Sequence, residues 1–476
     1  MNTDGHGFGT RQLSVFLRVH LCLILVLGAR LVSAQPHAGP DTRVLEARYE
    51  LAYPWWDLNR GLPLPASKTF ADSSGELRML NTSGAVETSG HAFFTPLGSD
   101  GRACVTCHQP TSAMSLSVDL IRQRWADTQG KDPLFAAIDG SNCPNLPQEK
   151  EASHSLLLER GLFRIALPWP PVAADGRPIQ PDFQIEVVRD PTGCNRNPAS
   201  ISVYRRPRVA ANLKSIAPAG GAMLMADGRE PSLQSQAVTA ALVHEQAREA
   251  PTPAQRKQIE DFERQLFLAQ DSDYLGGLLG EPGGPSMLGV ENVARGAASL
   301  SAAGNLAASF DPWRSASAST LAIRQRAFRE SVLRGVDLFA SREFRTADGK
   351  AVTCVACHRP GIKRWFDIGT TNLPTAKDFL ELPLFRITCA ASAPSHPQLG
   401  RVFFTQDPGH ALITGKCADA GSIVMQQFRG LIARAPYFAN GSAGDLMELV
   451  EFYDRRFGIG LTAPEKQDLV NLLSIL

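Results

Sequence analysis

The chain has 476 residues, a net charge of +1 with histidine neutral, and an ordinary apolar content of 43%. This length is enough for two or three domains with apolar cores. A net charge so close to zero provides no basic surface for nucleic acid or an anionic membrane, so we expect no nucleic-acid partner and infer partners from the sites instead.

Residues 1–34 have the three parts of a secretory signal. Arg11 and Arg18 precede an apolar run at 20–27, and small residues end at Ala34, where we expect cleavage. The run of about eight strongly apolar residues is too short to span a bilayer, and no later run reaches the roughly 18 that a span needs. The sequence predicts an exported, periplasmic protein without a membrane span after cleavage; an uncleaved anchor is the alternative.

The pattern Cys-x-x-Cys-His occurs at 104–108 and again at 354–358. Two thiols at this spacing can add to the two vinyl groups of one haem, and the adjacent imidazole then binds the iron. A zinc ribbon would place two such pairs close together, and a thioredoxin-like site would not need histidine both times. We predict two covalently bound c-type haems, held by Cys104, Cys107 and His108 and by Cys354, Cys357 and His358.

Four cysteines remain outside the signal and the two motifs: Cys143, Cys194, Cys389 and Cys417. In an oxidising compartment an even number suggests two disulfides. Of the three pairings, we favour Cys143 with Cys194 and Cys389 with Cys417, because each pair then lies within one haem-bearing half. Buried free thiols are the alternative.

In the first half, the proline-rich stretch 168–208 contains an alternating run at 183–188, which predicts a small β segment. Ser232 is placed to cap a helix at 233–249, and Thr252 opens a second helix. The apolar face of this second helix is formed by Ile259, Phe262 and Leu266.

In the second half, a helix is expected at 320–339, followed beyond the second haem motif by a loop-rich stretch to Gly421. Two helices, at 445–457 and 464–476, end the chain, and Thr462 with Glu465 forms a capping box for the last. Gly, Ala and Ser are concentrated between the two halves, at 276–309.

These patterns predict a mainly α fold of two cytochrome c-like haem domains with long loops and a small β excursion in the N-terminal half. The predicted divisions are the signal at 1–34, an N-terminal haem domain at 35–309 and a C-terminal haem domain at 310–476.

Taken together, the chain resembles the bacterial di-haem cytochrome c peroxidases and the related MauG enzymes. The resemblance covers residues 94–476 in patches. It is carried by the second haem motif and by Asp227-Gly228-Arg229 with Leu233 and Gln236, residues 435–442 and residues 446–453. It implies that peroxide or dioxygen reacts at the N-terminal haem, with His108 as proximal ligand. The C-terminal haem, held by His358, would pass electrons.

The chain departs from the family at three places. Ala226 stands where the family commonly has a tryptophan between the haems, and Ala439 stands where a histidine usually follows the Pro-Tyr-Phe segment. A calcium ion often lies between the domains in the family. Here Asn212 and the carbonyl of Pro436 could contribute ligands, but Arg434 brings an opposing charge.

For acid–base chemistry on the distal side of the N-terminal haem, the candidate catalytic residues are Gln236, His244 and Glu245. Cleavage of peroxide needs a group that takes a proton from one oxygen and gives it to the other. The family has a glutamate close to Glu245. Adjacent residues on an α-helix project about 100° apart, so we do not expect His244 and Glu245 to face the iron equally. The alternative is a surface Glu245 beside a partly buried His244.

The sixth ligand of the C-terminal haem comes from the final helices in the family, where MauG enzymes have a tyrosine in place of the peroxidases' methionine. Tyr453 occupies this position and lies on an apolar helical stripe. The alternatives are Met425 or Met447, with Tyr453 a core residue.

The predicted function is that of a periplasmic di-haem oxidoreductase that reduces hydrogen peroxide at the N-terminal haem, with electrons passed through the C-terminal haem. MauG-like oxidation of a protein or organic substrate is a variant of this function. The expected partners are hydrogen peroxide and a small periplasmic electron-donor or acceptor protein. The alternatives are a non-enzymatic di-haem electron carrier and a di-haem oxygenase.

Overall fold

The computed structural model describes residues 62–173, 175–216, 223–297, 306–315, 321–346, 349–358, 365–367 and 379–476. All of them belong to one compact unit, Ala47–Leu476. The predicted signal lies outside the described residues. Within the described part, none of the helices combines the length and the apolarity needed to cross a bilayer.

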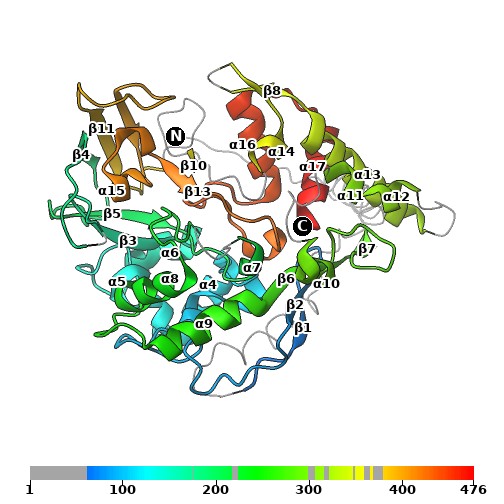
Figure 1. The fold of residues 1–476 in the computed structure, drawn as a ribbon, viewed down its shortest axis with the longest axis horizontal. Helices are drawn as coiled ribbons and strands as arrows, with labels where there is room; N and C mark the ends of the chain where they lie inside the picture. The colour runs from blue at the N-terminus through cyan, green and yellow to red at the C-terminus, as the bar shows by residue number, and fades with distance from the viewer. Residues whose placement is uncertain are drawn as a thin grey trace, which may run out of the picture. The chain divides into compact units, whose positions relative to one another are not determined.

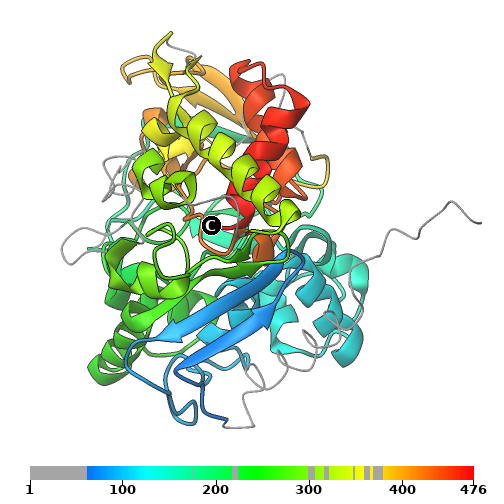
Figure 2. The same cartoon turned by 90° about the vertical axis from the view of Figure 1, so that its right-hand side faces the viewer.

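A four-stranded sheet forms part of the first half (Figures 1 and 2). Its strands, in spatial order, are β1 (Ser67–Ala71), β2 (Gly75–Asn81), β6 (Leu266–Asp273) and β7 (Gly277–Leu278). The blue hairpin of β1 and β2 is clear in Figure 2. The prediction missed this sheet, although β2 alternates buried and more exposed residues with Leu77 and Met79 in the core.

The two predicted helices after residue 232 exist, with different ends. Ser232 caps α8 (Leu233–Thr239), which continues as a π-helical turn, η4 (Ala240–His244), rather than as an α-helix to residue 249. Thr252 caps α9 (Pro253–Gln265), as predicted. The prediction was wrong for Leu266, which opens β6 instead of extending the apolar face of the helix.

Three helices form the core of the second half. They are α13 (Ile323–Ser341), α16 (Leu446–Phe457) and α17 (Ala463–Ser474). The predicted capping box of Thr462 and Glu465 is confirmed. Gly335 lets α13 approach α17 closely, because a β-carbon there would lie 2.2 Å from the carbonyl oxygen of Asp468.

A three-stranded sheet joins the two halves of the sequence. Its order is β12 (Val402–Thr405), β11 (Leu384–Cys389) and β4 (Phe183–Arg189). The β segment predicted at 183–188 is therefore confirmed. The loop-rich interpretation to Gly421 was wrong for β11 and β12. β11 pairs with β12, which follows it in the sequence, and with β4, which lies about 200 residues earlier and could not be recognised as a partner locally. The division into domains at residue 309 stays a prediction.

The remaining elements are short. In the first half they are α3 (Cys104–Cys107), α4 (Val118–Thr128), α5 (Ala137–Gly140), α6 (Ser155–Arg160), α7 (Leu213–Ile216), β3 (Phe163–Pro168) and β5 (Ser200–Arg205). Then come α10 (Val290–Asn292), α11 (Leu306–Ser309), α12 (Asp311–Ser315), β8 (Phe344–Arg345), β9 (Ala351–Val352), α14 (Cys354–Cys357), β10 (Trp365–Asp367), α15 (Ala411–Thr414) and β13 (Ser422–Val424).

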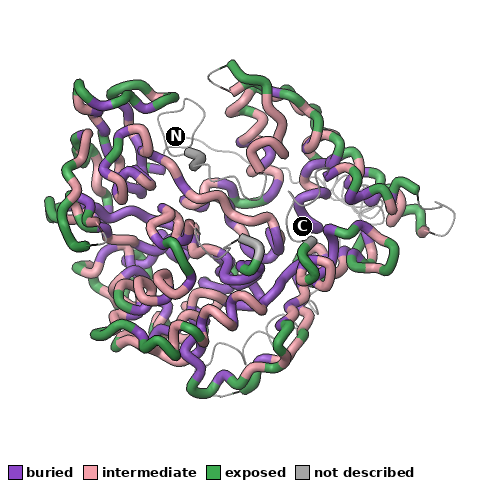
Figure 3. Tube along the Cα trace, in the orientation of Figure 1, coloured by how far each residue is buried: buried purple, intermediate pink, exposed green. Residues whose placement is uncertain are grey.

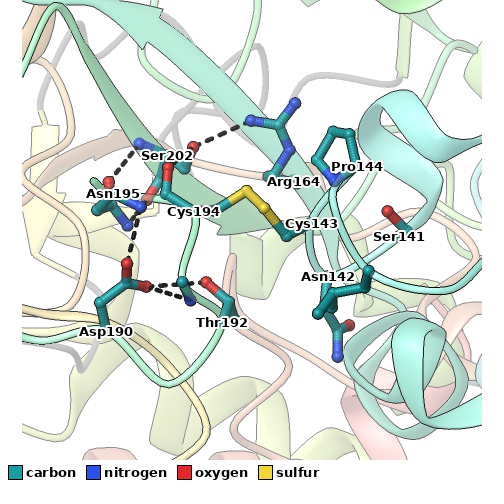
Figure 4. Close-up of a disulfide and its surroundings, with 12 residues drawn as sticks. Ser141, Asn142, Cys143, Pro144, Arg164, Asp190, Thr192, Cys194, Asn195 and Ser202 are labelled. Carbon is teal, nitrogen blue, oxygen red and sulfur yellow. Dashed lines mark hydrogen bonds between the residues drawn. A yellow bond between two sulfur atoms is a disulfide. The ribbon is translucent and has the colours of Figure 1, made fainter. Parts of the chain in front are cut away.

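Both predicted disulfides are confirmed. Cys143 is bonded to Cys194 and Cys389 to Cys417. Around the first bond, Asp190 and Ser202 hold the loop of Cys194 through hydrogen bonds to Asn195 (Figure 4).

Two large apolar cores lie directly against the haem motifs, and their buried segments are purple in Figure 3. The first contains Phe93, Val105, Ile259 and Phe262, so α3 is anchored by one of its own residues. The second joins α13, α16 and α17, with Cys354 and Val355 of α14 packed against it. Burial of these side chains, at roughly 1.5–3 kcal/mol each, is what positions the two motifs.

Candidate functional site

The first Cys-x-x-Cys-His motif forms the single helical turn α3. Residues three apart lie on the same side of a turn, so the free thiols of Cys104 and Cys107 face the same way. The turn ends at His108, whose N–H donates to the carbonyl of Cys104 at 3.1 Å. Val105 is a buried residue of the turn, and its backbone N–H donates to the carbonyl of Phe93 at 3.1 Å, which connects the motif to the core.

His108 is oriented for metal binding. Its Nδ1 lies 3.0 Å from the carbonyl oxygen of Met114. A carbonyl can only accept, so Nδ1 carries the proton and Nε2 keeps the lone pair that a metal needs. Burial lowers the pKa of His108, which keeps the imidazole in the neutral form that binds iron.

A cavity with about 1370 Å³ of empty space, part of it open to solvent, lies against this motif. Cys104, Cys107 and His108 all border it. The residues therefore fit a covalently attached haem, because two free thiols and an imidazole with its metal-binding nitrogen available meet one large space. The polar side chains on the rest of the wall are Arg102, Asp139, Arg205, Arg208, Gln236, His244, Glu245, Glu263, Gln426 and Gln427.

All three candidate catalytic residues, Gln236, His244 and Glu245, border this cavity. Which of His244 and Glu245 would face the iron stays a prediction, because both border the cavity. The two residues stand at the end of the π-helical turn η4, which ends at His244; the next N–H, that of Glu245, donates to the carbonyl of Ala240 at 3.2 Å. A π turn changes the angle between successive side chains, and such turns are frequent at functional sites.

Two buried carboxyl groups lie near the Cys104 thiol. Glu245 Oε1 is 3.4 Å from Cys104 Sγ, and its Oε2 accepts from the N–H of Leu97 at 3.2 Å. Burial raises the pKa of Glu245 to about 7. Burial, reinforced by the charge of Glu260, raises the pKa of Glu263 to about 8. At neutral pH this side of the cavity thus holds protonated or half-protonated acids.

His244 has a partner that could not be found from the sequence. Its Nδ1 is 2.7 Å from Oδ2 of Asp139, a residue 105 positions earlier and only 2% exposed. Asp139 has a φ of 64°, an uncommon backbone conformation for any residue but glycine. No spacing or periodicity connects the two residues, because a loop after α4 and a π turn after α8 bring them together.

The second motif forms an equivalent turn, α14, and the N–H of His358 donates to the carbonyl of Cys354 at 2.9 Å. Aromatic rings surround this histidine. The ring centroids of Phe428, Tyr453 and Phe339 lie 4.9, 5.8 and 6.0 Å from its own. Burial lowers the pKa of His358 to about 4, so it is neutral at pH 7. Among the described residues, its Nδ1 has no hydrogen-bond partner.

The sixth-ligand candidates are separated by the structure. Tyr453 of α16 packs edge-on against His358, and burial raises the pKa of its phenol. Met425 instead borders the cavity of the first motif. Of these two, Tyr453 is therefore the residue that lies near the second motif.

One short segment contacts both sites. Residues 424–427 form part of the cavity wall, and the next residue, Phe428, is the ring nearest to His358. Arg208 fixes the segment by donating to the carbonyls of Val424 at 2.6 Å and Met425 at 2.7 Å. The N–H of Val424 donates to the carbonyl of Ala226 at 2.8 Å. The segment therefore runs beside Ala226, the residue that stands where the family it resembles commonly has a tryptophan.

The side chain of Asn212 is fully used within the protein. Its Oδ1 accepts from the N–H of Leu268 at 3.0 Å, and its Nδ2 donates to the Leu268 carbonyl and to Gln427. The buried guanidinium of Arg434 donates to the carbonyl of the same Gln427. Among the described residues, no three His, Cys, Asp or Glu side chains are grouped to hold a metal ion. The expected calcium ion finds no support here, and we leave it out of the proposed function.

A buried ion network includes Arg205, one of the residues of the cavity wall. Arg205 donates to Asp227 at 2.5 Å and to both oxygens of Asp407 at 2.6 and 2.9 Å, and Arg229 donates to Asp227 at 2.6 Å. Burial by itself would raise the pKa of Asp227, but the two guanidinium groups outweigh it and hold this pKa below its usual range. Because Asp407 follows β12, the network connects the two halves of the sequence.

Known proteins resemble part of this chain. No family model matches it. The cytochrome-c peroxidase IdrP1 of Pseudomonas sp. (strain SCT) is 30% identical over 159 residues, which cover 30% of this chain and 40% of that protein. The cytochrome-c peroxidase IdrP2 of Denitromonas iodatirespirans is 28% identical over 130 residues, which cover 26% of this chain and 35% of that protein. The cytochrome-c peroxidase IdrP1 of the same organism is 29% identical over 153 residues, which cover 29% of this chain and 40% of that protein. The chain matches at most 40% of the length of these relatives, and the similarity supports a cytochrome c peroxidase-like family.

Proposed function

We propose that this protein is a periplasmic di-haem c-type oxidoreductase that reduces hydrogen peroxide at the N-terminal haem with electrons passed through the C-terminal haem. The observation that carries the proposal is the single cavity that Cys104, Cys107 and His108 share with His244 and Glu245. Attachment residues, an iron ligand and acid–base groups are the parts that peroxide reduction needs in one place. The partial similarity to cytochrome c peroxidases agrees with this reaction.

When bound, the haem supplies an iron position at which peroxide can be reduced. The overall reaction takes up two electrons and two protons and releases two waters. The residues of the chain contribute three things. Met114 holds His108 so that Nε2 would be available to bind the iron. Acids and bases on the cavity wall would move protons, and the apolar remainder of the wall would limit the access of water.

Electrons would reach this cavity from the second haem along residues 424–428. A small periplasmic electron-transfer protein is the proposed partner that supplies them. Phe428 contacts His358, and its chain neighbour Gln427 borders the cavity, so a single peptide unit separates the surroundings of the two haems.

Replacing Phe428 with leucine is expected to slow electron transfer between the haems, because it removes the ring that joins His358 to the cavity wall. The measurement is the rate of re-equilibration after flash reduction of one haem. Phe339→Leu is the matched control, since Phe339 also contacts His358, at 6.0 Å, but does not border the cavity. Equal slowing in both variants would show that only the packing around His358 matters.

Replacing Tyr453 with phenylalanine is expected to change the spectrum of the C-terminal haem and leave that of the N-terminal haem unchanged. A phenolate ligand would lower the reduction potential of the iron and favour MauG-like oxidation of a protein or organic substrate, whereas a thioether raises the potential. Electron paramagnetic resonance of the ferric protein measures the change. An unaltered spectrum in this variant would remove Tyr453 from the iron and favour the peroxidase reaction alone.

The proposed function is tested on the mature protein purified from a haem-attaching host. Its mass should equal the polypeptide plus two haems, less the hydrogens lost in two disulfides. Hydrogen peroxide should then oxidise a reduced small c-type cytochrome catalytically. A protein that holds two six-coordinate haems and does not react with peroxide in either oxidation state would instead be an electron carrier.

A further inference from the structure

Two residues on the wall of the first cavity are bonded to each other, and only one of them was a candidate from the sequence. We propose that Asp139 and His244 form the acid–base pair of this cavity, in which His244 moves the proton and Asp139 is a positioning residue. The inference rests on the proposed function for the identity of the oxidant. The existence of the pair itself rests on geometry.

The two side chains differ in exposure. Asp139 is 3% exposed at its side chain and His244 is 27% exposed, with 2.7 Å between Oδ2 and Nδ1. Both border the cavity, which also contains His108. His108 and His244 are close enough to interact electrostatically. The carboxylate is therefore the inner member of the pair and the imidazole the outer one.

The backbone holds Asp139 firmly in its unusual conformation. The next residue, Gly140, donates its N–H to the carbonyl of Ala136 at 3.0 Å, and its carbonyl is 2.7 Å from Nδ1 of His154. His154 is completely buried. Residues held in sparsely populated backbone conformations cluster at active sites and ligand-binding positions.

Asp139 determines which nitrogen of His244 can act as a base. A carboxylate only accepts hydrogen bonds, so Nδ1 carries the proton and Nε2 has a free lone pair. Nε2 can then take the proton from one oxygen of hydrogen peroxide and give it to the other, which leaves as water when the O–O bond breaks. The remaining oxygen leaves as a second water after two electrons, supplied through the haems, and two protons from solvent have been added.

The other two candidates are less suited to this proton transfer. The carboxyl of Glu245 is already bonded to the N–H of Leu97 and lies against Cys104 Sγ, at the attachment side of the cavity. Gln236 carries an amide, which can orient a ligand but does not exchange protons at ordinary pH. Apart from the attachment residues Cys104, Cys107 and His108, the other titratable groups bordering the cavity are Arg102, Arg205, Arg208, Glu245 and Glu263. Of these five, Arg102 interacts electrostatically with Asp139.

The test uses the haem-loaded protein, Asp139→Asn and two reactions. Cyanide in its neutral acid form must lose a proton as it binds ferric iron, so its binding rate reports the base without turnover. At neutral pH both cyanide binding and the peroxide reaction should slow by about 10²-fold, because an asparagine can donate to Nδ1 and fix the wrong tautomer. The difference in cyanide-binding rate between Asp139→Asn and the parent protein should disappear at alkaline pH, where cyanide is already an anion. Asp139→Glu should recover part of the rate.

Asp132→Asn is the matched control. Asp132 lies seven residues earlier, is 12% exposed at its side chain and pairs with Arg124, but it does not border the cavity. The cyanide-binding and peroxide rates of Asp132→Asn should stay within about threefold of those of the parent protein, as expected for a residue without a role in the proton transfer. Equal losses in both variants, no loss in Asp139→Asn, or a loss that is the same at every pH would overturn the proposal.

His244→Gln covers the case in which Asp139→Asn does not fold, because it leaves the turn at Asp139 untouched. It should show the same slow cyanide binding at neutral pH and the same recovery at alkaline pH; normal binding at neutral pH would overturn the proposal. A parent protein that binds cyanide in an Asp139-dependent manner but ignores peroxide would disprove the proposed function and keep the pair. The converse result, a peroxide reaction independent of both residues, would keep the function and disprove the pair.

Discussion

Replacing His108 with alanine is expected to reduce the reaction with hydrogen peroxide to the background level, with both haems still attached. In the proposed function Cys104 and Cys107 would hold the N-terminal haem covalently, so loss of the axial ligand need not release it. The imidazole held by Met114 is the residue of this motif placed to bind the iron. Mass spectrometry checks attachment, and stopped-flow spectroscopy of the peroxide reaction checks the loss.

His358→Ala is the paired variant for this experiment. This variant should still react with hydrogen peroxide when a small-molecule reductant supplies electrons, because the cavity at His108 is unchanged. Turnover with the cytochrome donor should fail, since electrons are proposed to pass through the second haem. If His358→Ala loses the peroxide reaction and His108→Ala keeps it, the roles of the two haems are reversed.

Replacing Asp227 with asparagine is expected to lower the free energy of unfolding by about 3–5 kcal/mol, the usual cost of removing one partner of a buried ion pair. Asp227 has no exposed surface and is bonded to both Arg205 and Arg229. Its loss leaves the buried charge of Arg205 shared with Asp407 alone. Denaturant unfolding of the haem-loaded protein measures the change.

Asp337→Asn is the control for Asp227→Asn. Asp337 pairs with Arg314 at 2.5 Å, but its side chain is 53% exposed, so its loss should cost less than about 1 kcal/mol. Similar losses in the two variants would mean that the buried network contributes no more than a surface ion pair.

The network also predicts a pH dependence of stability. The pKa of Asp227 is lower in the folded chain than the ordinary value of 3.8, because Arg205 and Arg229 more than offset the effect of burial. Its contribution is therefore complete above the unfolded pKa and is lost as the pH falls below about 4 through the folded pKa. The difference in stability between the parent protein and Asp227→Asn should shrink over that range.

Several features of this protein were determined by the sequence alone, because each depends on residues close together in the chain. Two thiols and a histidine within five residues specify the haem motifs, and in the structure each motif forms one helical turn. Helix starts at Ser232, Thr252 and Thr462 follow from a side chain bonding the N–H groups directly after it. The cysteine count and the division into halves were likewise enough to predict both disulfides.

Only the tertiary structure decided the composition of the cavity wall. Asp139 meets His244 across 105 residues, and β11 meets β4 across about 200, through contacts that no local periodicity records. The change from α-helix to π turn at Ala240, which lets both His244 and Glu245 border the cavity, is likewise absent from a pattern that reads as continuous helix. Haem attachment is local chemistry, whereas acid–base pairs and the path between two haems depend on which distant segments pack together.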